Sequence, residues 1–232
     1  MAFKEFNVTG IGAVTVYKRR GTGSLRLSIR HDGTIRVTIP AWMPYATGTE
    51  FVRARAKWVQ EHALPPTADL ENQQLIGKAH RLRFEPSTTS VKPTSRVKQS
   101  QIIITHPATL SSSEPVVQKL ARQASIRALR AQAERLLPIR LSELAKQHGF
   151  DYRSVSIKQL QGRWGSCDQN RNIVLNLFLM QLPWRLIDYV LLHELTHTNV
   201  MKHGPEFWSA MAHVEPNTPQ IRKEIKAYKP AI

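Results

Sequence analysis

The residues best able to do chemistry in this chain form the segment His193-Glu194-Leu195-Thr196-His197. Two histidines four positions apart in a helix lie on one face, one turn from each other, so both imidazoles can bind the same metal ion. Glu194 is offset enough to reach a water molecule at that metal. This spacing is typical of zinc hydrolases, and it predicts a Zn2+ site with His193 and His197 as ligands, one ion per chain.

A third ligand is expected soon after this helix. His203 is followed by Gly204 and Pro205, two residues that end helices and let the chain turn back toward the first two histidines. Three neutral imidazoles would complete a tetrahedral site that keeps one position open. His203 is therefore the preferred third ligand. The carboxylates that could complete the site in its place are Glu206, Glu215 and Glu224.

The elements around this segment must hold the histidines in position. Residues 183–192 begin with proline and carry enough apolar side chains for a half-buried helix that runs directly into His193. Residues 155–158 and 173–177 have the composition of strands. The segment 163–167 between them contains glycine and is expected to form a turn.

The expected chemistry is hydrolysis by water at the metal. Zinc would acidify that water and polarise the bond to be cut. Glu194 would act as the general base, taking the proton from the water and passing it to the leaving group.

Two supporting roles remain open at the level of sequence. The oxyanion that develops during hydrolysis needs an electrophilic partner; Arg163 is the first candidate, although a structural salt bridge is an equal alternative for it. Asn176 and Tyr228 are weaker candidates for the same role. A carboxylate that orients a zinc-bound histidine is also expected, and Asp168 and Asp188 are both open for it.

Several segments of the chain resemble the YgjP-like metallopeptidase family. Arg163-Trp164-Gly165-Ser166-Cys167, followed by Leu175-Asn176, is similar to the family's RWGSC and LN signature. The histidine segment, His203-Gly204 and Phe207-Trp208 are similar to its HELxH, H and FW pattern. The resemblance implies a zinc-dependent hydrolase, generally a peptidase, with a zincin-like catalytic domain related to that of SprT-like proteases.

Composition narrows the setting of this site. The chain has 232 residues, one cysteine and a net charge of +16, from 33 basic and 17 acidic side chains. The lone Cys167 excludes an intrachain disulfide, which fits a reducing compartment, and no leader or membrane-spanning segment is evident; we expect a cytoplasmic protein. The positive charge favours nucleic acid or another polyanion as a possible partner.

The pattern of elements predicts an α+β fold. Residues 1–105 are expected to form a small antiparallel β-rich subdomain, with a hairpin at 25–39, a helix at 51–58 behind a capping box at 47–50, and strands at 81–85 and 101–105 separated by a loop at 86–100. Turn-forming residues at 106–115 predict a linker. Residues 116–232 are expected to form the zincin-like catalytic domain, beginning with a helix that Pro138 kinks or divides and that Gly149 ends.

These features favour one function over two others. The leading hypothesis is a zinc-dependent metallopeptidase that binds a polypeptide along a sheet edge beside the metal. The first alternative is a zinc-dependent hydrolase of a small anionic substrate such as a nucleoside triphosphate, held by arginine and lysine. The second is a zinc protein associated with nucleic acid through its basic surface.

Overall fold

A computed structural model of the chain describes residues 2–29, 34–62 and 68–232. The chain forms two compact units, Met1–Ala68 and Asp69–Ile232. This division differs from the predicted linker at 106–115, which lies inside the larger unit. The strands before that linker share a core with the long helix after it, through Ile102 and Ile104 against Ala121 and Leu129. The turn-forming residues therefore mark only a loop within one unit.

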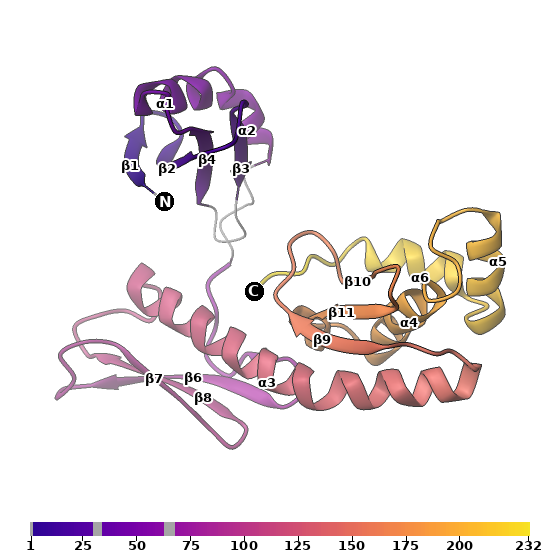
Figure 1. The fold of residues 1–232 in the computed structure, drawn as a ribbon. Coiled ribbons are helices and arrows are strands. Elements are labelled where there is room, and N and C mark those ends of the chain that lie inside the picture. Colours follow the sequence, from indigo (N-terminus) through magenta and orange to yellow (C-terminus); the bar gives the residue numbers. More distant parts are fainter. Residues whose placement is uncertain (1, 30–33, 63–67) are drawn as a thin grey trace. The chain divides into compact units, whose positions relative to one another are not determined.

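The described residues of the first unit form a four-stranded sheet and two helices (Figure 1). Its elements are β1 (Phe3–Val8), β2 (Gly12–Arg19), β3 (Arg26–Ile29), β4 (Ile35–Pro40), α1 (Tyr45–Arg53) and α2 (Ala56–His62). The strand order is β1-β2-β4-β3. Alternate residues of the strands, including Val14, Val16 and Val37, form a core with Val52 of α1 and Val59 of α2.

Two predictions for this unit are partly wrong. The hairpin at 25–39 is confirmed, because β3 and β4 pair antiparallel with Ile29 opposite Ile35, and residues 30–33 of its turn lie outside the described residues. The sheet is not purely antiparallel, since β2 and β4 run parallel. The single helix behind a capping box is replaced by α1 and α2, and α1 begins after Pro44 without a side-chain cap.

The larger unit contains two further sheets and four α-helices. Its elements are β5 (Leu75–Ile76), β6 (His80–Ser87), β7 (Thr94–Lys98), β8 (Gln101–Pro107), α3 (Pro115–His148), β9 (Ser154–Lys158), β10 (Gly165–Cys167), β11 (Asn172–Asn176), the 3-10 helix η1 (Leu177–Gln181), α4 (Trp184–Thr196), α5 (Pro205–Val214) and α6 (Thr218–Ile225). Among the helices of the described ranges, none has the length and apolar character that crossing a bilayer requires.

Helix α3 is the element on which this unit is assembled (Figure 1). Pro138 does not divide it, and Gly149 ends it in the left-handed conformation, with φ of 71°. One half of α3 packs on the sheet of order β5-β6-β8-β7. Two buried glutamines fasten this half: Gln118 bonds both main-chain groups of Leu70, and Gln132 accepts from the Lys78 amide and donates to the Ile76 carbonyl.

Two predictions for the sheet of order β5-β6-β8-β7 are wrong: the loop at 86–100 and the purely antiparallel pairing. Strand β7 lies inside the segment 86–100, which was expected to be a loop, and β6 pairs with β8 in parallel. The segment is polar and its strand lies at the sheet edge, so it lacks the apolar alternation by which a half-buried strand is recognised. The predicted strands at 81–85 and 101–105 are confirmed.

The second sheet, of order β10-β11-β9, lies beside α4 and α3. The segment 163–167, expected to be a turn, contributes β10, which pairs antiparallel with β11. Asp188 of α4 forms a two-pronged salt bridge with Arg140 of α3, at 2.8 Å and 2.9 Å, and joins the two helices. Helix α4 thereby has a fixed position against both the long helix and β10.

Candidate metal centre

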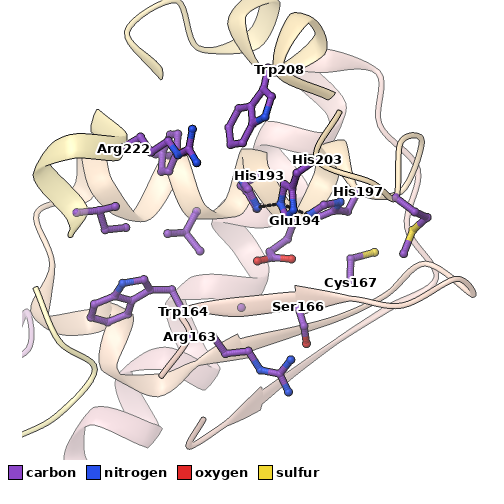
Figure 2. Close-up of a pocket in the computed structure, with 15 residues that line it drawn as sticks. Arg163, Trp164, Ser166, Cys167, His193, Glu194, His197, His203, Trp208 and Arg222 are labelled. Atoms are coloured by element: carbon purple, nitrogen blue, oxygen red, sulfur yellow. Dashed lines mark hydrogen bonds between the residues drawn. The ribbon is translucent and has the colours of Figure 1, made fainter. Parts of the chain in front are cut away.

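The three predicted histidines meet at one point of the larger unit. His193 lies in the last turn of α4, and His197 caps the end of that helix. The chain then turns back, and His203 lies just before α5. The imidazole nitrogens that could bind a metal all lie within 4.8 Å of one another. Figure 2 shows the three side chains gathered at one place.

The geometry of these nitrogens fits a metal ion. His203 Nε2 lies 3.0 Å from His193 Nε2 and 3.0 Å from His197 Nε2. A neutral imidazole nitrogen carries either one hydrogen or one lone pair, so His203 Nε2 cannot make a well-directed hydrogen bond to both neighbours. Tetrahedral zinc with bonds of about 2.0–2.1 Å holds its nitrogen ligands about 3.3 Å apart, close to the observed spacing.

Aromatic packing from α5 holds the imidazoles in place. The ring of the fully buried Phe207 lies 4.9 Å, 4.5 Å and 4.7 Å from the rings of His193, His197 and His203. Trp208 stacks on His203 with ring centroids 5.7 Å apart. A contact between α5 and the three histidines restricts their rotamers, so the site is shaped before any ligand binds.

The protein also keeps two of these imidazoles neutral. Burial, followed by the neighbouring His197, His203 and Arg222, lowers the pKa of His193 to about 3. Burial likewise lowers the pKa of His197, whose Nδ1 lies 3.1 Å from the Val200 carbonyl. Donation from Nδ1 to that carbonyl leaves the Nε2 lone pair for the metal.

Neither of the two carboxylates that were candidates to orient a histidine has a histidine as its hydrogen-bond partner. Asp188 is occupied by Arg140, and the exposed Asp168 accepts bonds from Asn170 and Asn172 in the turn between β10 and β11. A main-chain carbonyl does the orienting for His197 instead. The buried Nδ1 of His193 has no hydrogen-bond partner among the described residues.

Glu194 lies between the histidines and strand β10 (Figure 2). Its side chain is only 5% exposed, and its Oε2 has no hydrogen-bond partner in the described ranges. Burial raises the pKa of Glu194 to about 8, while the charge of Arg163 acts in the opposite direction. A cation held by the histidines would also favour the ionised carboxylate. An unpaired carboxylate beside a metal site is suited to accept a proton.

The approach of β10 to Glu194 depends on a glycine. A Cβ atom at Gly165 would lie 2.6 Å from Glu194 Oε1 and 2.8 Å from its Cγ. Real Cβ atoms do not approach other atoms so closely. Strand and carboxylate can therefore be neighbours only because residue 165 has no side chain.

A cavity of about 650 Å³ opens over these groups. Its lining residues come from β10 and the segment before it, from α4, and from the region that follows α4: Arg163, Trp164, Gly165, Ser166, Cys167, Tyr189, Val190, His193, Glu194, His197, Met201, His203, Trp208, Arg222 and Ile225. Besides the histidines, the cavity is thus lined by one carboxylate and two guanidinium groups. The cavity therefore offers an acid–base group, a metal donor set and cationic partners together.

The chain matches the family described as "YgjP-like, metallopeptidase domain" over residues 23–228. It belongs to the YgjP-like metallopeptidase family. The three histidines and Glu194 all lie within the matched residues. The resemblance carried by the RWGSC and HELxH segments is thereby confirmed, as is the α+β fold class.

Two solved structures are similar to part of this YgjP-like chain. The metallopeptidase zymogen jannalysin of Methanocaldococcus jannaschii is 18% identical, has a TM-score of 0.35, and is matched over 39% of this chain and 93% of its own. The metallopeptidase zymogen abylysin of Pyrococcus abyssi is 21% identical, with a TM-score of 0.37 and coverage of 40% and 93%. No curated protein matches the sequence.

The remaining candidates of this YgjP-like protein fall outside the metal centre. Asn176 is fully buried and donates to the carbonyls of Leu160 and Arg163 at 3.1 Å and 2.8 Å, a structural role. Tyr228 is exposed and does not line the cavity. Of the alternative carboxylates, Glu224 pairs with Arg185, Glu215 bonds the Asn217 amide, and Glu206 is exposed.

Arg222 is the cavity residue that sequence reasoning missed. It belongs to α6, its guanidinium lies 4.3 Å from the centre of the Trp208 ring, and its charge contributes to the lowered pKa of His193. Arg163 also lines the cavity, but Figure 2 shows its side chain directed away from the histidines. No motif distinguishes Arg222 from the neighbouring basic residues of α6, so only the fold could reveal it.

Proposed function

We propose that this YgjP-like protein is a zinc-dependent metallopeptidase. The observation that carries the proposal is the convergence of three imidazole nitrogens beside a buried, unpaired glutamate. His193, His197 and His203 would hold the ion. Family membership supports the metallopeptidase class, and the zinc ion and the roles of individual residues are our proposal.

The chain's own groups would divide the work of hydrolysis. Bound zinc supplies Lewis acidity, which lowers the pKa of water and polarises a carbonyl group. Glu194 takes a proton from the attacking water and delivers it to the leaving amine nitrogen. Its burial keeps competing hydrogen-bond donors away from the carboxylate, so the proton passes between water, Glu194 and substrate.

A guanidinium would stabilise the negative charge that develops on the substrate oxygen. Arg163 and Arg222 both line the cavity, and they are the two candidates. Arg222 is favoured by its stacking on Trp208, which itself stacks on His203, because a stacked guanidinium is held in one orientation.

Extended polypeptide is the substrate class that the cavity supports best. Strand β10 is the terminal strand of its sheet, and its residues Gly165, Ser166 and Cys167 line the cavity. Main-chain groups at a sheet edge can pair with an extended peptide and recognise its backbone. Trp164, Val190 and Ile225 add apolar surface for side chains of the substrate.

Hydrolysis of a small anionic compound is the second candidate, favoured by the two guanidinium groups in the cavity. A nucleoside triphosphate would use them to hold its phosphates. Strand β10 and its neighbours also give the cavity polar and apolar surface, and that surface has no role with so small a substrate. The peptidase therefore remains the better explanation.

The test uses the full chain, stripped of metal by a chelator and reloaded with zinc. Unfolded casein, a peptide pool and a nucleoside triphosphate serve as substrates. We expect cleavage of casein and peptides to return as zinc reaches about one ion per chain. Turnover of the triphosphate alone would replace the peptidase with the anion hydrolase, and activity that is indifferent to metal would contradict both.

A further inference from the structure

The sheet of the first unit has one covered face and one open face. A Cβ atom at Gly48 of α1 would lie 2.6 Å from Val16, so Val16 points toward this helix. The neighbouring side chains of β2, Thr15 and Tyr17, therefore point the other way, because successive residues of a strand alternate between faces. The open sheet face consists of Phe3, Glu5, Asn7, Ala13, Tyr17, Arg19, Arg26, Ser28, Arg36 and Thr38; Thr15 and Pro40 point the same way but are buried.

Strand register brings aromatic and basic side chains together on this face. Phe3, Tyr17, Thr38 and Arg26 form one row across the four strands. Phe3 and Tyr17 stack with ring centroids 5.4 Å apart and an angle of 29° between planes. The guanidinium of Arg36 lies 3.9 Å from the centre of the Tyr17 ring. Phe3 is 55% exposed, so much of this preformed stack remains open to a ligand.

The charge of this unit complements an anion. By sequence, residues 1–68 carry ten Lys and Arg against four Asp and Glu. The open sheet face itself holds Arg19, Arg26 and Arg36, and its one acidic residue is Glu5. The other two basic strand residues, Lys4 and Lys18, lie over Tyr45 at the edge of α1. The arginines of the open sheet face thus lie on the same side of the sheet as the aromatic stack, whereas Lys4 and Lys18 point to the covered face.

We propose that the open sheet face binds single-stranded nucleic acid. An exposed ring on a sheet surface can stack on an unpaired base, whereas the bases of a duplex are already stacked on each other. Arginines beside the stack can bind the phosphates of the same strand. The proposal is independent of the peptidase, and it gives the first unit, Met1–Ala68, a role in bringing the enzyme to nucleic acid.

The test measures fluorescence anisotropy of a labelled oligothymidylate of about 16 nucleotides, titrated with the full chain, beside a duplex of the same length. We expect the single strand to bind more tightly than the duplex, with an affinity that falls as salt rises. Phe3→Ala should weaken binding by about fivefold or more, because it removes the stacking surface. Glu5→Gln should strengthen it, since it removes the acidic group from the face.

Matched controls separate this site from general attraction of charge. Arg26→Gln and Lys57→Gln each remove one positive charge, but Lys57 lies on α2, which contributes Val59 to the core on the covered face. We expect Arg26→Gln to weaken binding more than Lys57→Gln. Phe3 and Arg26 are both exposed, so thermal unfolding should show that these variants remain folded. Absence of binding, or equal binding of strand and duplex that Phe3→Ala leaves unchanged, would overturn the proposal.

Discussion

Replacing Gly165 with alanine probes the tightest contact of the site. The added Cβ would lie 2.6 Å from Glu194 Oε1, whereas ordinary contacts begin at 3.4 Å, so one group must move by about 0.8 Å. Strand β10 is held by its pairing with β11, with Gly165 opposite Leu175. The Glu194 carboxylate is therefore expected to move, away from the position in which it meets the attacking water.

A misplacement of about 1 Å can lower a catalysed rate about 100-fold, which corresponds to about 2.7 kcal/mol in the activation free energy. We expect kcat/KM of Gly165→Ala for a fluorogenic peptide to fall by about this factor while zinc content stays unchanged. Gly23→Ala is the control, because its Cβ would meet nothing within 4 Å. In a Glu194→Gln background the alanine should have little further effect. Activity of Gly165→Ala within about twofold of wild type would refute the steric reasoning.

Four further substitutions test the neighbouring assignments. Arg222→Gln should lower kcat/KM about 100-fold in steady-state kinetics, and Arg163→Gln should lower it less; the opposite ranking would make Arg163 the electrophile. Asp188→Asn should lower the free energy of unfolding in urea by about 1 kcal/mol, because the salt bridge to Arg140 is lost. We expect its zinc affinity to stay unchanged. A tenfold loss of zinc affinity would mean that Asp188 orients a histidine after all. Asn176→Ala should cost about 2–3 kcal/mol in the same unfolding measurement, because it leaves buried carbonyls unpaired, and a loss below about 0.5 kcal/mol would contradict its structural role.

The convergence of the three histidines could be predicted from sequence because their placement is local. Helical periodicity alone brings His193 and His197 to one face, and glycine and proline after His203 indicate the turn that returns it to them. The packing of Phe207 against this group follows from the same short segment. Local rules were sufficient wherever the residues concerned lie within one helix and the turn that follows it.

Features that depend on tertiary contacts were not predicted. The carbonyl of Val200 orients His197, and a main-chain group leaves no signature in the sequence. Arg222 reaches the cavity only because α6 packs against α4. The division between units lies near Ala68 because the strands of residues 75–107 bury their apolar faces on α3, a choice that turn-forming residues cannot indicate. The strands β1 and β2 were missed although the alternation of Val14, Thr15 and Val16 resembles a half-buried strand.

The most direct test of the metallopeptidase compares wild type with Glu194→Gln, measuring zinc content and hydrolysis of unfolded casein on the same preparations. We expect about one zinc per chain in both proteins and a loss of hydrolysis of about 100-fold or more in the variant, because Gln cannot take the proton from water. Hydrolysis at the wild-type rate by Glu194→Gln would contradict the proposed function. So would a wild-type protein that hydrolyses casein without binding a metal.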